Sequence, residues 1–124
     1  MHWLAVAIGG ALGALSRYAV TAHLMPAEAG RIPTGTLLVN VLGSFLMGVF
    51  FVLIFERGLM TPEWRSVITA GFLGAFTTFS TFSLESFVLW QHGHVQLAIS
   101  YVAISVISCL LAVASGAFMV SRIF

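Results

Sequence analysis

Long apolar stretches alternate with short polar turns along the whole chain. The turns carry the proline, arginine and histidine residues that interrupt the hydrophobic pattern, and the apolar stretches cover residues 3–24, 33–55, 64–90 and 95–120. A helix needs about 20 mostly apolar residues to cross the hydrocarbon core of a bilayer. Each stretch is long enough, so the pattern predicts a fold of four transmembrane helices.

The composition supports a membrane environment for all four stretches. The chain is 60% hydrophobic and only 7% charged, with a mean hydropathy of +1.07, whereas a soluble domain carries about 25% charged residues. A chain this apolar could not maintain a solvated surface. Since the connecting turns are short, we expect residues 1–124 to form a single all-α integral membrane domain, surrounded by the lipid bilayer.

The arginines are distributed almost evenly between the two sides of the predicted bundle. With four spans, one side holds Arg57, Arg65 and Arg122, and the other holds Arg31, with Arg17 inside the membrane nearer to it. An excess of Lys and Arg orients membrane proteins, and here the excess is slight. Either this small bias orients the chain, or the chain inserts both ways and pairs head to tail.

The first span contains a pair of glycines and a charge. Gly9 and Gly13 are four residues apart, a small-xxx-small pattern that lets membrane helices approach closely. Arg17 is expected to be functional, because a charge at the centre of a span costs at least about 2.5–3.5 kcal/mol. It snorkels toward the turn at Pro26, pairs with backbone carbonyls or Glu85, or draws anions toward an opening. The sequence leaves these alternatives open.

The second span carries a polar stripe. Thr36, Asn40, Ser44 and Gly48 are spaced four residues apart and therefore share one side of a helix. Such a stripe in a membrane must face protein or water, so it forms either a hydrogen-bonded seam between helices or the wall of a pore. Asn40 is the most informative member, because its amide offers two donors and one acceptor at mid-span.

The fourth span repeats the pattern. Tyr101, Ser105 and Cys109 are again four residues apart, and Ser108 lies beside them. Cys109 is the single cysteine, so the chain has no intrachain disulfide. The histidines lie near the ends of the spans and form no metal-ligand spacing with it.

The third span contains the segment GFLGAFTTFSTFSLE at residues 71–85. Its glycines, followed by the polar and β-branched run at 77–81, are poorly suited to a continuous helix and predict a break in mid-membrane. Free backbone groups at that depth are tolerated only inside protein or beside a hydrated cavity. Broken membrane helices use their carbonyls to bind cations and their N-terminal dipoles to bind anions.

Hydroxyl and aromatic side chains follow the predicted break. The hydroxyl groups there belong to Thr77, Thr78, Ser80, Thr81 and Ser83. Phe79 and Phe82 are three residues apart and would share a face once the helix resumes. Because the edges of aromatic rings are electropositive, such a pair can contact a small anion. Packing in the core or against lipid is the alternative for both rings.

Three segments together resemble the CrcB/Fluc family of fluoride channels: GGALGALSRY at 9–18, GTLLVNVLGSFLMGV at 35–49 and the segment at 71–85. The similarity covers essentially the whole chain, and the TTFSTFS run is its most specific part. The resemblance implies a fluoride-selective channel, not an enzyme. Such a channel would let cytoplasmic fluoride leave passively through the bacterial inner membrane and so confer fluoride resistance.

The resemblance also implies an assembly. Proteins of this family are dual-topology antiparallel homodimers with two pores, each lined by both subunits. A structural sodium ion at the dimer interface is held by backbone carbonyls, which here would be those of Gly74 and Thr77. The matching phenylalanines are Phe79 and Phe82, and the matching pore asparagine is Asn40.

The expected fluoride pathway therefore comprises Asn40, Phe79, Ser80, Thr81, Phe82, Tyr101, Ser105, Ser108 and Cys109. Arg17, Thr36, Ser44 and Glu85 are expected to support it. Some relatives have serine at the position of Cys109. Because a thiol is a poorer donor than a hydroxyl, Ser108 is the alternative donor at that end of the track. Neutral donors suit conduction, which needs binding weak enough for the ion to leave.

Two other classes of function share some of these sequence features. A small multidrug-type exporter also has four spans, but it needs an embedded carboxylate, usually early in the chain. The first span has none, and Glu85 lies in the third. An assembly subunit held by glycine seams would account for the glycines but not for three polar stripes. An enzyme is disfavoured because no nucleophile–base or metal constellation is present.

Overall fold

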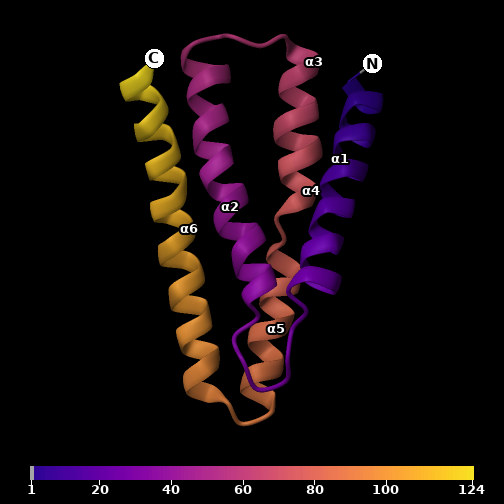
Figure 1. The fold of residues 1–124 in the computed structure, drawn as a ribbon, viewed down its shortest axis with the longest axis vertical. Coiled ribbons are helices and arrows are strands. Elements are labelled where there is room, and N and C mark those ends of the chain that lie inside the picture. The colour runs from indigo at the N-terminus through magenta and orange to yellow at the C-terminus, as the bar shows by residue number, and fades with distance from the viewer. Residues whose placement is uncertain (1) are drawn as a thin grey trace.

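The computed structural model describes residues 2–124, which form a bundle of helices without strands (Figure 1). The first two spans consist of α1 (His2–Tyr18) with the π-helical segment η1 (Ala19–Leu24), and α2 (Thr34–Phe51) with η2 (Val52–Glu56). The last two consist of α3 (Pro62–Arg65), η3 (Ser66–Leu73), α4 (Gly74–Phe76) and α5 (Phe79–Gln91), and of α6 (Val95–Ile123).

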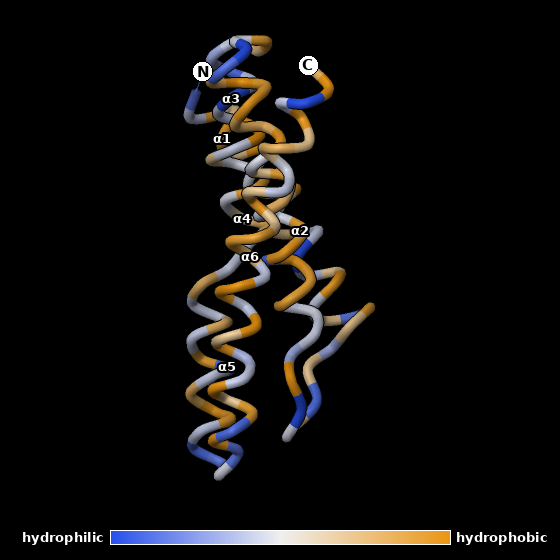
Figure 2. Tube along the Cα trace, turned by 90° about the vertical axis from the view of Figure 1, so that its left-hand side faces the viewer, coloured by the Kyte–Doolittle hydropathy of each residue, from blue (hydrophilic) through white to orange (hydrophobic). Residues whose placement is uncertain are grey.

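The helical runs are long and apolar enough to cross a membrane in four places. They cover His2–Leu24, Thr34–Glu56, Pro62–Gln91 and Val95–Ile123. Apolar residues fill the middle of the bundle and hydrophilic residues gather at its two ends (Figure 2). The predicted all-α class with four apolar helices is therefore confirmed, and the chain has the features of a multi-pass membrane protein.

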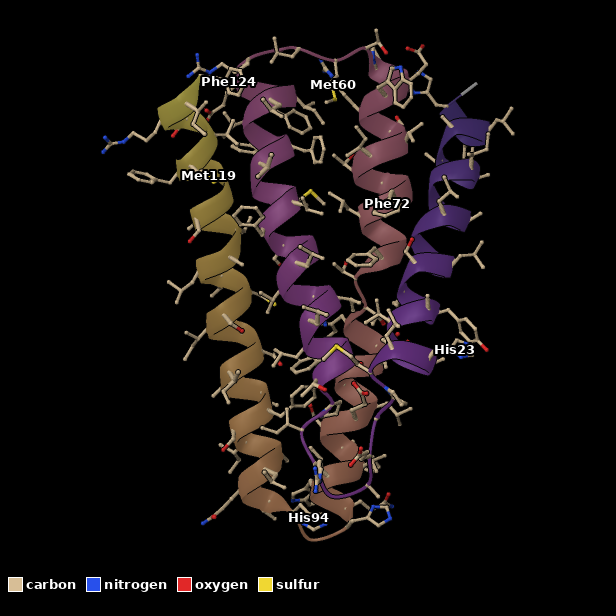
Figure 3. The ribbon with its side chains drawn as sticks, viewed as in Figure 1. His23, Met60, Phe72, His94, Met119 and Phe124 are labelled. Carbon is tan, nitrogen blue, oxygen red and sulfur yellow. The ribbon has the colours of Figure 1, made fainter. Side chains whose placement is uncertain are left out.

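Polar turns join the helices at the two ends of the bundle. The turn between α5 and α6 uses Gly93, whose φ of 86° is a left-handed conformation that side chains disfavour. At the opposite end, the Thr61 hydroxyl caps α3 by accepting from the Trp64 N–H. His94 accordingly lies at one end of the molecule and Met60 at the other (Figure 3), and the two termini share the Met60 end.

The outer surface of the single chain is apolar, as expected for contact with lipid or with another apolar surface. More than half of the side chain is exposed for many large residues on it, among them Trp3, Leu15, Leu110, Phe118 and Ile123. The buried apolar residues are few by comparison, and one cluster of them, Phe82, Leu89, Ala98 and Tyr101, lies between α5 and α6. Little of the apolar surface is therefore hidden within one chain.

Glycines set the closest helix contacts, as their spacing predicts. A Cβ on Gly13 would strike the Phe72 carbonyl, so α1 and η3 pack backbone against backbone. A Cβ on Gly48 would strike the Val113 carbonyl in the same way, so α2 and α6 approach closely. These are packing contacts of the small-xxx-small type.

Helical geometry is interrupted inside the third run. Helix α4 ends at Phe76, and both following residues have extended backbones, Thr77 with φ −88° and ψ 156° and Thr78 with φ −149° and ψ 117°. Helix α5 then starts at Phe79. The extended stretch is visible as the thin segment between α4 and α5 in Figure 1.

Candidate functional site

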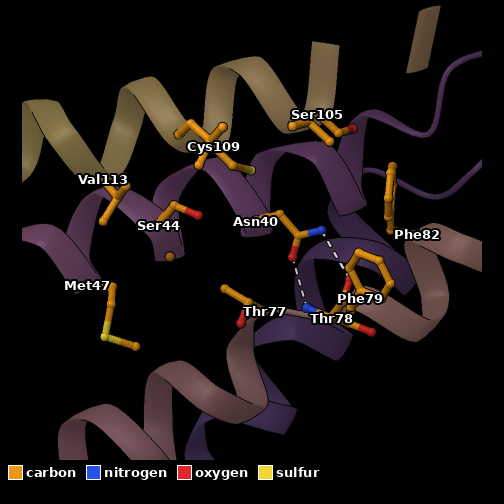
Figure 4. A pocket seen from close by; sticks show the side chains of 13 residues that line it. Asn40, Ser44, Met47, Thr77, Thr78, Phe79, Phe82, Ser105, Cys109 and Val113 are labelled. Carbon is orange, nitrogen blue, oxygen red and sulfur yellow. Dashed lines mark hydrogen bonds between the residues drawn. The ribbon is translucent and has the colours of Figure 1, made fainter. Parts of the chain in front are cut away.

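The side chain of Asn40 pairs with the backbone of the interruption. Its Oδ1 accepts from the Thr78 N–H at 2.8 Å, and its Nδ2 donates to the Thr78 carbonyl at 3.1 Å (Figure 4). In a continuous helix the Thr78 N–H would bond to the carbonyl of Gly74. The amide of Asn40 replaces that bond, and the Gly74 carbonyl loses its helical partner. An Asn side chain has two N–H donors, so one is left for another acceptor.

Threonines terminate the helix on both sides of the interruption. The Thr77 hydroxyl donates to the Leu73 carbonyl at 3.0 Å, which closes the end of α4. The Thr78 hydroxyl accepts from the Thr81 N–H at 3.2 Å and so caps the start of α5. The carbonyl end of one helical run and the N–H end of the next therefore meet at this point, with dipoles that favour a cation and an anion, respectively.

Arg17 contacts the segment just before the interruption. Its Nε donates to the Ala75 carbonyl at 2.9 Å, from a half-buried position on α1. Of the alternatives open for Arg17, the structure shows pairing with a backbone carbonyl. The Glu85 carboxylate is bonded elsewhere.

Glu85 joins three helices through its two oxygens. The Thr36 hydroxyl on α2 donates to Oε2 at 3.0 Å, and the Tyr101 hydroxyl on α6 donates to Oε1 at 3.0 Å. Both donors are buried, with exposed fractions of 2% and 0%. Sequence reasoning assigned these residues to three separate spans and missed that they meet. Spacing within one helix carries no information about which residue lies opposite on another.

An open groove of about 420 Å³ runs along α2 and α6 and past the interruption. The predicted site residues that line it are Asn40, Ser44, Thr77, Phe79, Phe82, Ser105 and Cys109. The stripe on α2 is divided between this groove and buried contacts with other helices. Asn40 and Ser44 face the groove, whereas Thr36 and Gly48 are buried against other helices.

The two phenylalanines of the predicted pair differ in environment. Their ring centroids are 5.5 Å apart. Phe82 is 7% exposed and packs edge-on against the Tyr101 ring, with centroids 5.2 Å apart. Phe79 is 77% exposed on the single chain. One ring belongs to the core, and the other projects beyond it.

Ser105 presents a buried hydroxyl to the groove. The residue is 5% exposed, and within residues 2–124 its Oγ has no hydrogen-bond partner. A buried polar group without a partner costs about 1–3 kcal/mol. A water molecule or another polar guest in the groove would remove that cost. Cys109 lines the same wall one helical turn further along α6.

Several other predicted residues lie away from this groove. Thr81 lines a second cavity of about 180 Å³ together with Thr36 and Glu85. Ser80 is exposed, and its hydroxyl is 3.5 Å from that of Thr78. The Ser108 hydroxyl donates to the Ile104 carbonyl of its own helix. Tyr101 is occupied with Glu85, and Gly74 is exposed within α4.

Sequence reasoning missed part of the lining. The additional residues are Gly43, Met47, Val106, Leu110 and Val113, together with Thr78. Gly43 follows Asn40 by three residues and so shares its helix face, a spacing that could have revealed it. The apolar members carry no signal that separates them from lipid-facing residues.

The whole sequence agrees with one known family. The profile described as "CrcB-like protein, Camphor Resistance (CrcB)" matches residues 4–117. The chain belongs to the CrcB family. The residues that line the groove all lie within the matched range.

Curated CrcB-family relatives align over nearly the full chain. The "Fluoride-specific ion channel FluC" of Saccharophagus degradans is 63% identical over 111 residues, covering 90% of this chain and 83% of the relative. The protein of the same name from Hahella chejuensis is 50% identical over 115 residues, covering 93% and 91%. That of Acidobacterium capsulatum is 42% identical, covering 99% and 98%. These names are those of ion channels, which is not an enzymatic activity, and they give no support to a multidrug-type exporter.

Proposed function

We propose that this chain is a fluoride-selective ion channel, located in the bacterial inner membrane, through which cytoplasmic fluoride leaves and which thereby confers resistance. The observation that carries the proposal is the groove at the helix interruption. There, the Asn40 amide and the Ser105 hydroxyl, which has no partner within residues 2–124, line the same space as the Phe79 and Phe82 rings. The names of the relatives point to the same ion.

The chemistry of the groove suits a small, strongly hydrated anion. Its lining residues include hydroxyl, amide and thiol groups but no charged side chain. Neutral donors can replace the water around fluoride stepwise, and they bind it weakly enough for the ion to leave. A larger halide would be excluded by the narrow spacing of the aromatic rings, whose electropositive edges line the path.

The interruption places the positive end of a helix dipole beside the proposed path. We place Thr77 and Thr78 at the middle of the bilayer, where irregular backbone is tolerated only beside protein or a hydrated cavity. The N-terminal end of α5 then offers a positive dipole to the anion. No energy source is required, because a negative-inside potential contributes about 2.3 kcal/mol per charge per 100 mV toward export.

A second, inverted copy of the chain completes the pathway in this proposal. Phe79 is 77% exposed on the single chain, so its surroundings must come from lipid or from a partner. A dual-topology antiparallel homodimer would provide a protein partner, and the balanced arginines permit both orientations. Ser80 and Ser108, which do not line the groove of one chain, would contribute only in that dimer. Thr81 and Tyr101 would extend the path toward the second cavity.

The carbonyls of Gly74 and Thr77 fit a structural sodium ion at the dimer interface. The Gly74 carbonyl has lost its helical donor to Asn40, and Thr77 is extended. Backbone oxygens are the ligands that a hard cation prefers. Bound there, sodium would supply a fixed positive charge that attracts the anion. Arg17 and Glu85 would support this arrangement by holding α1 and three other helix segments around the interruption.

The test is ion release from liposomes that contain the purified chain. The vesicles are loaded with potassium fluoride, and valinomycin is added to carry the compensating charge. A fluoride electrode should record rapid release, and vesicles loaded with potassium chloride should release little chloride. Release that requires a proton gradient and saturates at a low rate would indicate a carrier instead of a channel.

A further inference from the structure

The one cysteine of the chain lies in the proposed pathway. Cys109 is a partly exposed free thiol on α6, and its sulfur points toward the space beside Asn40 and Ser44 (Figure 4). Ser105, one turn earlier, has a buried hydroxyl without a partner in the described part of the chain. Buried polar groups are normally satisfied by protein or water. A polar guest in the groove at this level would satisfy that hydroxyl, and the thiol borders the same space.

We propose that Cys109 is a site of covalent thiol modification at which the pathway closes. The inference rests on the proposed function, because it assigns a means of control to the same groove. The matching reagents are small, uncharged sulfur electrophiles. The lining has no charged side chain that would draw a large ionic reagent inward, and the neutral donors proposed for fluoride would not offset the cost of burying a larger charged group at this depth.

The reaction is a thiol exchange that can be written with methyl methanethiosulfonate. The Cys109 sulfur, as thiolate, attacks the methylthio sulfur of the reagent, and its proton passes to water in the groove. An S–S bond forms, and the bond to the sulfonyl group breaks. Methanesulfinate leaves with the electron pair. The cysteine is thereby oxidised to the disulfide level and the sulfonyl sulfur is reduced.

The added group lies where the ion must pass. Residues four apart on a helix have Cβ atoms about 5–6 Å from each other, and the methylthio group lengthens the Cys109 side chain by two atoms. It therefore reaches the space in front of Ser105 and would displace a guest that satisfies this hydroxyl. Loss of this hydroxyl as a donor to the ion should lower the flux by about tenfold, which corresponds to about 1.4 kcal/mol in the barrier.

The experiment uses the full chain in fluoride-loaded liposomes. Wild type and Cys109→Ser are treated with methyl methanethiosulfonate, and fluoride release is compared before treatment, after it, and after dithiothreitol. Wild-type release should fall by about tenfold and recover with dithiothreitol. Intact mass should show a single methylthio group, because the chain has one cysteine. Cys109→Ser should show the same release before and after treatment.

A matched control places the thiol elsewhere on the same helix. In Cys109→Ser/Ala114→Cys the new thiol starts from an exposed residue that does not line the groove. Its modification should leave the flux of that variant unchanged. Inhibition through this second thiol, inhibition of Cys109→Ser, or a wild type that is labelled but conducts normally would each overturn the inference. Absence of labelling would do the same.

The failure of this inference can be told apart from failure of the channel proposal. A wild type that releases no fluoride before treatment refutes the channel, and with it the pathway that Cys109 would close. A wild type that conducts but is insensitive to labelling refutes only the modification site. Should Cys109→Ser be inactive, Cys109→Ala takes its place. The recovery of wild-type fluoride flux after dithiothreitol tests the inference without any variant.

Discussion

At the scale of single residues, one side chain replaces a helical hydrogen bond that the interruption removes. Asn40 binds both the N–H and the carbonyl of Thr78, and this N–H is the group that loses its helical partner at the interruption. A buried backbone group without a partner is costly. The amide therefore stabilises the extended conformation and still presents an N–H to the groove, which combines a structural role with a binding role in one residue.

The two phenylalanines should respond differently to truncation. Phe82→Ala opens a cavity against Tyr101 and should lower both fluoride flux and thermal stability, since such a change typically costs about 3–5 kcal/mol in a packed core. Phe79→Ala should lower the fluoride flux about as much as Phe82→Ala does. Its unfolding temperature should stay within a few degrees of wild type. The measurements are fluoride release from liposomes and thermal unfolding followed by gel filtration.

Phe87→Ala is the matched control for this pair. It removes a ring of the same helix that is 51% exposed and does not line the groove, so flux and stability should both stay near wild type. Full flux in both Phe79→Ala and Phe82→Ala would remove the rings from the pathway. Equal loss of stability in the two variants would contradict the division into one core ring and one projecting ring.

At the scale of helices, the sequence predicts the elements better than their meeting points. The lengths of the apolar runs give the four spans, and the glycine and threonine content of residues 71–81 points to the place where Thr77 and Thr78 become extended. Periodicity also places Asn40 and Ser105 on polar faces. It does not reveal that Glu85 bonds to both Thr36 and Tyr101, because pairing across helices depends on their rotation and depth.

The contact between α2 and the interruption can be tested at Gly43. A Cβ on this residue would strike the Cγ2 methyl of Thr77, so Gly43→Ala should displace Thr77 and reduce fluoride flux. Overpacking of this kind typically costs about 1–3 kcal/mol. Thr77→Ser removes the methyl group and keeps the hydroxyl that bonds to Leu73. The double variant Gly43→Ala/Thr77→Ser should therefore recover most of the flux.

Gly10→Ala is the matched control for this test. A Cβ there would have its nearest neighbour at 3.9 Å, in the Gly71 carbonyl, which is an ordinary contact. Its flux should stay close to wild type. The two substitutions at 43 and 77 should be strongly non-additive, as expected for groups in direct contact. If the double variant is no more active than Gly43→Ala alone, the methyl clash is not what couples α2 to the interruption.

At the scale of the whole molecule, the single chain is incomplete in a consistent way. Its core is small, its outer surface is apolar, and Phe79 projects from the groove. Both termini lie at one end, so inversion of a copy would bring opposite ends together. The end that holds the termini has three arginines, Arg57, Arg65 and Arg122. Toward the other end lie Arg31 and the half-buried Arg17. These features agree with the proposed inverted dimer.

Dual topology predicts that two oppositely oriented chains must cooperate. Arg31→Gln removes the exposed positive charge at one end and should fix the termini in the cytoplasm, whereas Arg57→Gln/Arg122→Gln should fix them outside. Fusions at the C-terminus report the orientation, since a fluorescent protein matures in the cytoplasm and alkaline phosphatase works outside it. For wild type both fusions should be active. Each biased variant alone should lose fluoride flux, and their co-expression should restore it.

Arg57→Lys serves as the control, because it keeps the positive charge and therefore the balance of arginine and lysine between the two ends. This variant should conduct alone. A biased variant that conducts fully by itself would contradict the inverted dimer. So would a wild type in which a single fusion is active. Either result would leave the exposed face of Phe79 to be covered by lipid or by a parallel copy, and the shared pathway would then have to be built from one orientation. Complementation between the two variants is the outcome that only opposite orientations explain.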